Sequence, residues 1–298
     1  VYVSGGGKAS IYEFNFSGGN LTPSRVFPIV AEKDRKPEDF IGDVQLSPDG
    51  HLLYAADMYR DSIAVVNPQS GMMISRIKTA HRPYRILFHP SGKSLFVSSW
   101  SDGIVGQYDA NSGMQMATIR VGPHTTDMVW LNGEVEDQPN YKARLFVAAS
   151  NTNNVYVFGV SESGSFTRIE TINLALTPRQ PVGSTPSGLG LSADGSKLLV
   201  ACSDLNAAAV VDVAGAHSRV SGFVPTGWYP TQVYGLPDGR MAVLNGKGLR
   251  SYANPLGPTP FRGSADKLPD GSPTHFMPRM QTGTVQLLAL DDAKMPEY

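Results

Sequence analysis

The stretch that decides the fold is SPDGHLLYAA at residues 47–56, which returns as HPSGKSLFVS at residues 89–98. Aligning Tyr54 with Phe96 gives a period of 42 residues. Shorter copies lie at residues 192–199 (SADGSKLL) and 237–243 (PDGRMAV), and a degenerate copy spans residues 131–146. Each copy centres on a tight turn, because Gly tolerates positive φ and Asp can bond its own backbone. The sequence is therefore an internal repeat with one strand on each side of the turn.

Each repeat contains enough alternating or apolar segments for four strands. The first strands are predicted at residues 84–88, 187–191 and 231–234, and the most apolar, second strands follow the turns. Third strands are predicted at residues 62–66, 103–108, 154–158 and 208–212, and outer, fourth strands at residues 73–77 and 115–119. Four antiparallel strands in about 40 to 45 residues are typical of a β-propeller blade. No segment has a sustained helical period, which disfavours an α/β fold.

The number of blades follows from the number of third strands. Seven are counted when residues 10–14, 249–252 and 284–288 are included, but only five first strands are found. We therefore expect one all-β domain over residues 1–298, a seven-bladed propeller of four-stranded antiparallel blades. The N-terminal blade is expected to be incomplete, with about one blade of sequence missing upstream. Residues 254–278 are rich in Pro and Gly and are predicted to form one long irregular loop.

Composition narrows the possible functions. The 298 residues are 41% hydrophobic with a net charge of −1, so strong binding to nucleic acid is not expected. No apolar run reaches the 18 residues that would predict a membrane-spanning helix. The single cysteine, Cys202, lies in an apolar run and is expected to be buried. We expect a monomer.

The second-strand segments resemble the YVTN-type repeat of bacterial surface-layer-like propellers. The matching segments are YVSG at residues 2–5, YAAD at residues 54–57, FVSS at residues 96–99 and AVLN at residues 242–245. PTGWYP at residues 225–230, NGKGL at residues 245–249, NPLGP at residues 254–258 and QTGTV at residues 281–285 resemble the subgroup found before an alkaline-phosphatase-like phosphoesterase domain. The resemblance implies an exported bacterial protein, periplasmic or at the cell surface. It also implies a catalytic domain after residue 298, whose metal ligands lie outside this chain.

Propeller geometry directs the search for a site to one face. The loops before first strands and the loops between second and third strands share that face, and the first strands align at Ile41, Pro83, Thr125, Pro186 and Pro230. The polar and aromatic residues at aligned positions form the predicted ligand site: Asp43, His81, Arg82, Arg85, His124, Asp127, Trp228, Tyr229 and Gln232. Arginine forks suit a small anionic ligand. Alternatively, Asp43, Arg85 and Asp127 on consecutive blades tie the blades together.

No catalytic residue, metal or cofactor is predicted. His81 and His124 are only two candidate ligands, which is too few for a metal site, and no nucleophile elbow or phosphate loop is present. Some seven-bladed propellers are lactonases that use Glu, His and Arg at the channel mouth. Glu32, Glu38 and Glu134 do not lie at aligned positions here. Whether the chain is an enzyme stays open.

A last set of aromatic residues could either stack on a ligand or pack the ends of the sheets; it comprises Tyr59, Tyr84, Trp100, Trp228 and Tyr229. The sequence therefore predicts a module that binds a ligand or a protein partner, or acts as a scaffold. The alternatives are part of a hydrolase, either a phosphoesterase with its catalytic domain elsewhere or a lactonase, and binding of single-stranded nucleic acid.

Overall fold

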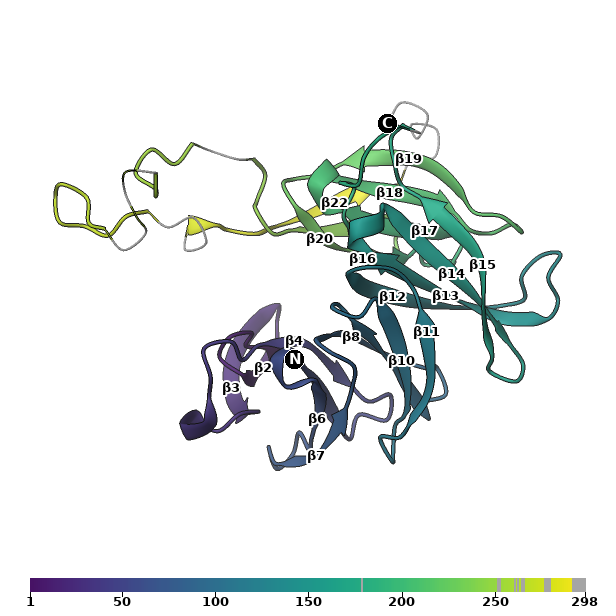
Figure 1. Cartoon of the computed structure of the whole chain (residues 1–298), viewed down its shortest axis with the longest axis horizontal. Coiled ribbons are helices and arrows are strands. Elements are labelled where there is room, and N and C mark those ends of the chain that lie inside the picture. The colour runs from purple at the N-terminus through teal and green to yellow at the C-terminus, as the bar shows by residue number, and fades with distance from the viewer. Residues whose placement is uncertain are drawn as a thin grey trace. The chain divides into compact units, whose positions relative to one another are not determined.

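The computed structural model describes residues 1–177, 179–250, 253–259, 261, 263, 266–275 and 280–290. These residues fall into two compact units, Val1–Val182 (unit 1) and Gly183–Tyr298 (unit 2). The fold is an all-β propeller of antiparallel blades, as the repeat predicts (Figure 1). A single domain over residues 1–298 stays a prediction.

Unit 1 contains four blades. Blade 1 has three strands, β1 (Tyr2–Ser4), β2 (Ser10–Ser17) and β3 (Asn20–Pro28). Blade 2 consists of β4 (Ile41–Leu46), β5 (Leu53–Asp57), β6 (Ser62–Val66) and β7 (Met73–Lys78). Blade 3 consists of β8 (Pro83–Phe88), β9 (Ser94–Ser99), β10 (Ile104–Asp109) and β11 (Gln115–Arg120). Blade 4 consists of β12 (Thr125–Asn132), β13 (Tyr141–Ala149), β14 (Asn154–Ser161) and β15 (Phe166–Asn173).

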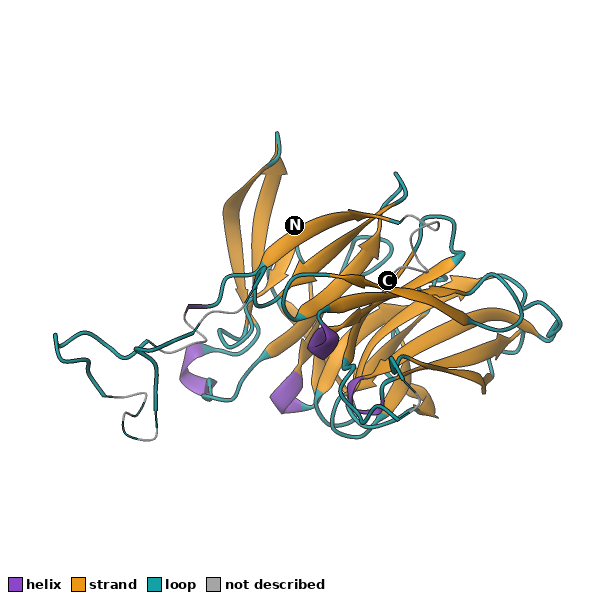
Figure 2. Ribbon diagram, turned by 90° about the horizontal axis from the view of Figure 1, so that it is seen from above, coloured by secondary structure: helices purple, strands orange, loops and turns teal. Residues whose placement is uncertain are grey.

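Unit 2 contains two blades. Blade 5 consists of β16 (Pro186–Leu191), β17 (Lys197–Cys202), β18 (Ala207–Asp212) and β19 (Arg219–Pro225). Blade 6 has three strands, β20 (Pro230–Gly235), β21 (Arg240–Asn245) and β22 (Thr284–Ala289). Four single 3-10 turns connect strands, η1 (Glu32–Asp34), η2 (Met58–Arg60), η3 (Ser150–Thr152) and η4 (Ser203–Leu205) (Figure 2).

The predicted number of seven blades is wrong, since the described residues form six. The error comes from residues 249–252, which were counted as a third strand. Leu249 and Arg250 lie in no strand, and Ser251 and Tyr252 lie outside the described residues. The third strand of blade 6 is β22, which pairs with β21 from Arg240↔Ala289 to Asn245↔Thr284. One blade was therefore counted twice, because a long insertion separates its second strand from its third.

The blades bury their apolar strands against one another within each unit. In unit 1 Tyr54, Ile63 and Val65 of blade 2 share one buried cluster with Leu95 and Tyr108 of blade 3. In unit 2 the cluster joins strands β17 and β18 to Val233, Met241 and Val243 of blade 6. The second strands of blades 2 and 3 are buried on both faces, because each of these blades has a neighbour on both sides within unit 1. Cys202, at the end of β17, is fully buried, and burial raises the pKa of its thiol to about 12.

Two repeated backbone features shape the face where first strands begin. The pairing of each first strand with its second strand shifts register close to its first residue, at Ile41, Pro83, Thr125, Pro186 and Pro230. The residue just before four of these strands has positive φ: Arg82 (51°), His124 (56°), Thr185 (51°) and Tyr229 (59°). A bulge and a left-handed residue together turn the chain sharply and redirect the side chains around them.

Candidate functional site

The nine predicted site residues fall into two sets. Six lie in unit 1 and three in unit 2, and each set is built by the same repeated loops. Within the described residues no group of three or more His, Cys, Asp or Glu side chains could hold a metal ion. None of the described helices is both long and apolar enough to cross a membrane.

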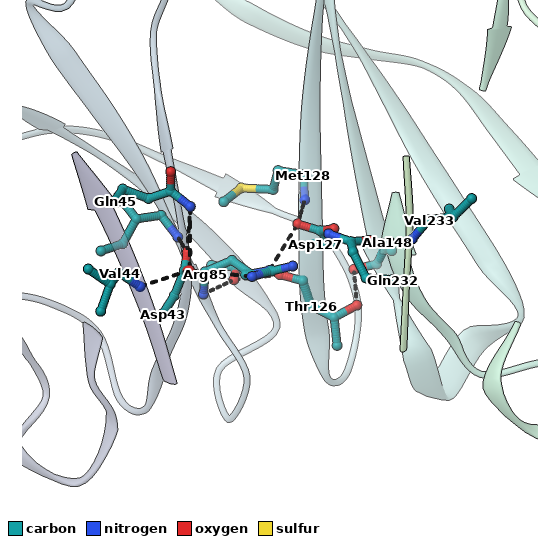
Figure 3. A network of polar contacts seen from close by, with 12 residues as sticks. Asp43, Val44, Gln45, Arg85, Thr126, Asp127, Met128, Ala148, Gln232 and Val233 are labelled. Carbon is teal, nitrogen blue, oxygen red and sulfur yellow. Dashed lines mark hydrogen bonds and ion pairs between the residues drawn. The ribbon is translucent and has the colours of Figure 1, made fainter. Parts of the chain in front are cut away.

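In unit 1 the side chain of Arg85 bridges two carboxylates on neighbouring blades (Figure 3). Its Nη1 lies 3.3 Å from Asp43 Oδ1, and its Nε lies 3.2 Å from Asp127 Oδ1. Both carboxylates are buried, whereas the Arg85 side chain is 25% exposed. Ion pairs of this kind tie β4, β8 and β12 together, as the structural alternative predicted. The charge of Arg85 is therefore already balanced by protein groups.

The side chain at this aligned position also accepts a backbone hydrogen bond at the bulge near the start of the strand. Asp43 accepts a hydrogen bond from the N–H of Val44 at 2.9 Å, and Asp127 accepts one from Met128 at 2.9 Å. The arginine at the equivalent position of blade 3, Arg85, cannot accept such a hydrogen bond because its guanidinium has only donors. Instead, the N–H of Ile86, which follows Arg85, donates to Asp43 Oδ2 at 2.9 Å. Asp43 thus satisfies the bulges of two blades, which is a structural role.

Arg82 is placed quite differently from Arg85. Its guanidinium carbon lies 5.1 Å from the ring centroid of Tyr59 and 5.8 Å from that of Trp100. The indole of Trp100 in turn stacks on the His124 imidazole, with centroids 4.0 Å apart and planes 13° apart. Tyr59, Arg82, Trp100 and His124 therefore form a continuous row of stacked groups on three consecutive blades, here called the aromatic row. Within the described residues, no carboxylate forms an ion pair with the Arg82 guanidinium.

The backbone of Arg82 and His124 in the aromatic row is fixed by hydrogen bonds to the neighbouring loops. The N–H of Arg82 donates to Asp61 Oδ1 at 2.9 Å, and Asp61 itself has a left-handed φ of 48°. The C=O of Arg82 accepts from the N–H of Trp100 at 3.1 Å, and the C=O of His124 accepts from Ser150 at 2.9 Å. Arg82 and His124 are thus presented by a preorganised backbone, not by flexible loops.

His81 lies beside the row and forms a pair with Asp102. Its backbone N–H donates to Asp102 Oδ2 at 2.8 Å, and its Nδ1 lies 3.1 Å from the same oxygen. Burial alone would raise the pKa of Asp102, but the two contacts from His81 hold that pKa below its usual range. The His81 side chain is 73% exposed. Its orientation is therefore set by a carboxylate while the rest of the ring faces solvent.

In unit 2 the three predicted residues have separate surroundings. Gln232 is buried, and its Oε1 accepts from the N–H of Val233 at 3.0 Å, as Asp43 and Asp127 do in their blades. The N–H of Tyr229 donates to Asn206 Oδ1 at 2.8 Å, and its ring lies 3.9 Å from Lys247 Nζ. Burial, together with the charge of Asp204, raises the pKa of the Tyr229 phenol. Trp228 is 42% exposed and lines a cavity.

Two residues of the aromatic row, Tyr59 and Trp100, were not among the nine predicted site residues. Tyr59 and Trp100 were assigned only to a general aromatic set, although both lie in loops between second and third strands, on the predicted face. The position of Lys142 beside Glu134, with Nζ and Oε1 2.5 Å apart, gives this glutamate an exposed ion pair away from the row.

Comparison with known proteins supports the fold. No family model matches the chain, and no curated protein matches it in sequence. Similar solved structures include two putative 6-phosphogluconolactonases, from Bacteroides fragilis (20% identity) and Bacteroides uniformis (18% identity), each with a TM-score of 0.57. A periplasmic gluconolactonase from Pseudomonas aeruginosa matches with 18% identity and the same TM-score. The matches cover 75% or 76% of this chain and 67% or 68% of those chains. At such identities the likeness establishes the propeller fold.

Proposed function

We propose that this propeller is a binding module that takes up a small anionic ligand at the aromatic row of unit 1. One observation carries the proposal: the Arg82 guanidinium lies between two aromatic rings, while the neighbouring Arg85 is balanced by Asp43 and Asp127. An arginine that contacts aromatic rings has N–H donors that suit a carboxylate or a phosphate. The ligand contact is thus assigned to Arg82 and the tie between blades to Arg85.

The rings of the row suggest the other part of the ligand. Tyr59 is 45% exposed, so its ring offers a face to a molecule that binds beside Arg82. Aromatic faces stack on planar rings and on the apolar faces of sugars. A sugar acid or a sugar phosphate combines such a ring with an anionic group. We therefore propose this class of ligand.

The proposal is tested by calorimetric titration with gluconate, 6-phosphogluconate and glucose. The two anions are expected to bind, and uncharged glucose is expected to bind at least about tenfold more weakly, the effect of one charge-assisted hydrogen bond. Arg82→Met should remove that preference. Arg120→Met, which removes an exposed arginine from β11 of the same unit, is the matched control. Equal binding of glucose and gluconate, or an unchanged affinity in Arg82→Met, would refute the proposal.

A second candidate function is lactone hydrolysis. It is favoured by the pair His81–Asp102, in which a carboxylate orients an exposed imidazole next to Arg82. His81 would accept a proton from water as the water oxygen attacks the lactone carbonyl. The ring C–O bond would then break, and the proton would return to the leaving ring oxygen. Two of the three similar structures are putative 6-phosphogluconolactonases and the third is a gluconolactonase, which agrees with this candidate, although their likeness is one of fold.

Hydrolysis of gluconolactone tests this candidate. The reaction is measured by the uptake of base, and its rate is compared with the spontaneous rate. Turnover should fall at least about a hundredfold in His81→Gln, the usual contribution of a general base. Asp102→Asn should lower turnover less. Gluconate binding should persist in both variants, so a failure of hydrolysis does not decide the binding proposal. Turnover that is unchanged in His81→Gln would exclude His81 as the base.

We also propose that the chain is part of an exported bacterial protein, periplasmic or at the cell surface, that carries a phosphoesterase domain. The support is the resemblance of residues 225–230, 245–249 and 254–258 to the last blades of such proteins. The intact mass and N-terminal sequence of the natural protein, together with its distribution after cell fractionation, test the proposal. A cytoplasmic protein of this chain's length would contradict it.

A further inference from the structure

Unit 2 contains a cavity of about 490 Å³ at one end of blade 6. That volume lies within the range of small-molecule sites in proteins. The cavity is lined by four segments: Trp228 before β20, Lys247 to Arg250 after β21, Ala253 and Asn254, and residues between Met280 and Thr284 that lead into β22. Its described lining residues all belong to unit 2, whereas the aromatic row belongs to unit 1.

One wall of the cavity is held by main-chain hydrogen bonds. The N–H of Trp228 donates to the C=O of Gly248 at 2.7 Å, and the N–H of Lys247 donates to the C=O of Trp228 at 3.1 Å. Gly248 has a φ of +77°, and a Cβ there would lie 2.9 Å from the C=O of Thr282. The segments on both sides of the cavity therefore approach each other closely, and Trp228 and Lys247 are fixed relative to one another.

The lining combines apolar side chains with positive charge. Trp228 is 42% exposed, Leu249 62% and Met280 51%, so three large apolar side chains that face solvent gather at one cavity. Lys247 and Arg250 also line it, and no acidic residue does so among the described residues. The ammonium of Lys247 is held over the Tyr229 ring, 3.9 Å from its centroid. An apolar pocket with a fixed cation at its edge complements a molecule that has an apolar body and one negative charge.

We propose that this cavity binds a small amphipathic anion, with an aromatic or alkyl body against Trp228, Leu249 and Met280. The carboxylate, sulfonate or phosphate of that molecule lies at Lys247. Stacking on the indole supplies the apolar contact, and the ammonium supplies the charge contact.

Two fluorescent probes test the proposal because they share one ring system and differ in charge. Anilinonaphthalene sulfonate is the anionic probe, and phenylnaphthylamine is its uncharged counterpart. The sulfonate is expected to bind more tightly. Lys247→Met should weaken its binding about fivefold, the effect of one partly exposed charge, and should leave the uncharged probe unchanged. Met280→Asp should weaken both probes.

Lys93→Met is the matched control, because Lys93 is an exposed lysine of unit 1. Thermal unfolding of each variant checks that the fold is retained, and Leu249→Ser replaces Met280→Asp if that variant unfolds. Equal affinity for the two probes would overturn the proposal. So would a sulfonate affinity that is the same in Lys247→Met as in Lys93→Met.

Discussion

Among single residues, Arg85 connects three blades through its two ion pairs. Its side chain neutralises Asp43 and Asp127, whose side chains are 7% and 8% exposed. Arg85→Met would leave two buried carboxylates without a cation, which we expect to lower the free energy of unfolding by about 3 kcal/mol. Urea unfolding measures the loss. Adding Asp127→Asn should recover part of it, because one of the two unbalanced charges is then removed.

Arg82→Met is the control for this prediction. It removes an arginine three residues away that stacks on rings and pairs with no carboxylate of the described residues. Its cost should stay within about 1 kcal/mol, the range of a cation–π contact at an exposed site. If Arg82→Met proved as destabilising as Arg85→Met, the division between a binding arginine and a structural arginine would be wrong.

The ion pair of Glu13 with Arg25 makes stability depend on pH. Arg25 Nε lies 2.7 Å from Glu13 Oε2, and its hydrogen bonds hold the pKa of Glu13 at about 2, below the ordinary 4.5. The unfolded chain therefore takes up this proton first. The stabilisation is complete above pH 4.5 and is lost as the pH falls toward about 2.

Glu13→Gln is accordingly expected to lower the urea midpoint near neutral pH and to flatten its decline in acid. Glu38→Gln, at an exposed glutamate, should leave the decline as it is in the unaltered chain. A Glu13→Gln variant with an undiminished decline would show that other carboxyls account for the acid sensitivity.

The different surroundings of Arg82 and Arg85 could not be predicted from residue types alone. Aligning the repeats placed Arg82 and Arg85 correctly at the start of a first strand, and it left two possibilities for Arg85, a ligand pocket shared with Arg82 or a tie between blades. Their different surroundings depend on the bulge, which sends Arg85 toward Asp43 and Asp127 and leaves Arg82 against rings. That outcome depends on side-chain direction after a left-handed residue, which a repeat period does not encode.

At the scale of elements, the connections between blades rely on one recurring hydrogen bond. Asp61 in the loop before β6 accepts from the N–H of Arg82, and Asn206 in the equivalent loop before β18 accepts from Tyr229. Both acceptors have left-handed backbone, with φ of 48° and 53°. Asp61→Ala would lose the acceptor and place alanine in that conformation. We expect it to cost about 2 kcal/mol in free energy of unfolding.

Asp61→Asn should change the free energy of unfolding little. Asparagine at residue 206 likewise accepts the hydrogen bond and adopts the left-handed backbone. The comparison of the two variants by urea unfolding isolates the acceptor from the charge. Equal stability of Asp61→Ala and Asp61→Asn would show that the hydrogen bond to Arg82 contributes nothing measurable.

Most strands follow from the sequence because alternation and turns are local properties. All five first strands begin at the residues aligned in the repeat, from Ile41 to Pro230. Residues 249–252 were misassigned for a physical reason. The partner of β21 is β22, which lies beyond the insertion, and pairing across so long a loop leaves no local signal near Leu249.

At the scale of the whole molecule, the sheets at the two ends of the sequence differ from those between them. In blade 6 Leu288 packs against the core of unit 2, while Val285 (65%), Leu287 (53%) and Tyr234 (48%) are exposed. In blade 1 Ile11 and Phe27 are buried, while Val3, Phe16 and Val26 are exposed. By contrast, the second strands of blades 2 and 3, which have neighbours on both sides within unit 1, are fully buried.

These exposed strands predict self-association that increases with protein concentration. Apolar residues on an open strand favour pairing between chains, and a net charge of −1 supplies little repulsion. The monomer expected from the sequence should therefore prevail in dilute solution, with a larger species at high concentration in sedimentation velocity. Leu287→Lys should shift the balance toward the monomer, because a charge on the strand opposes pairing. Val182→Lys is the control, since Val182 is 60% exposed in a loop outside the strands. If Leu287→Lys and Val182→Lys associated to the same extent, the contact between chains would lie elsewhere than on β22.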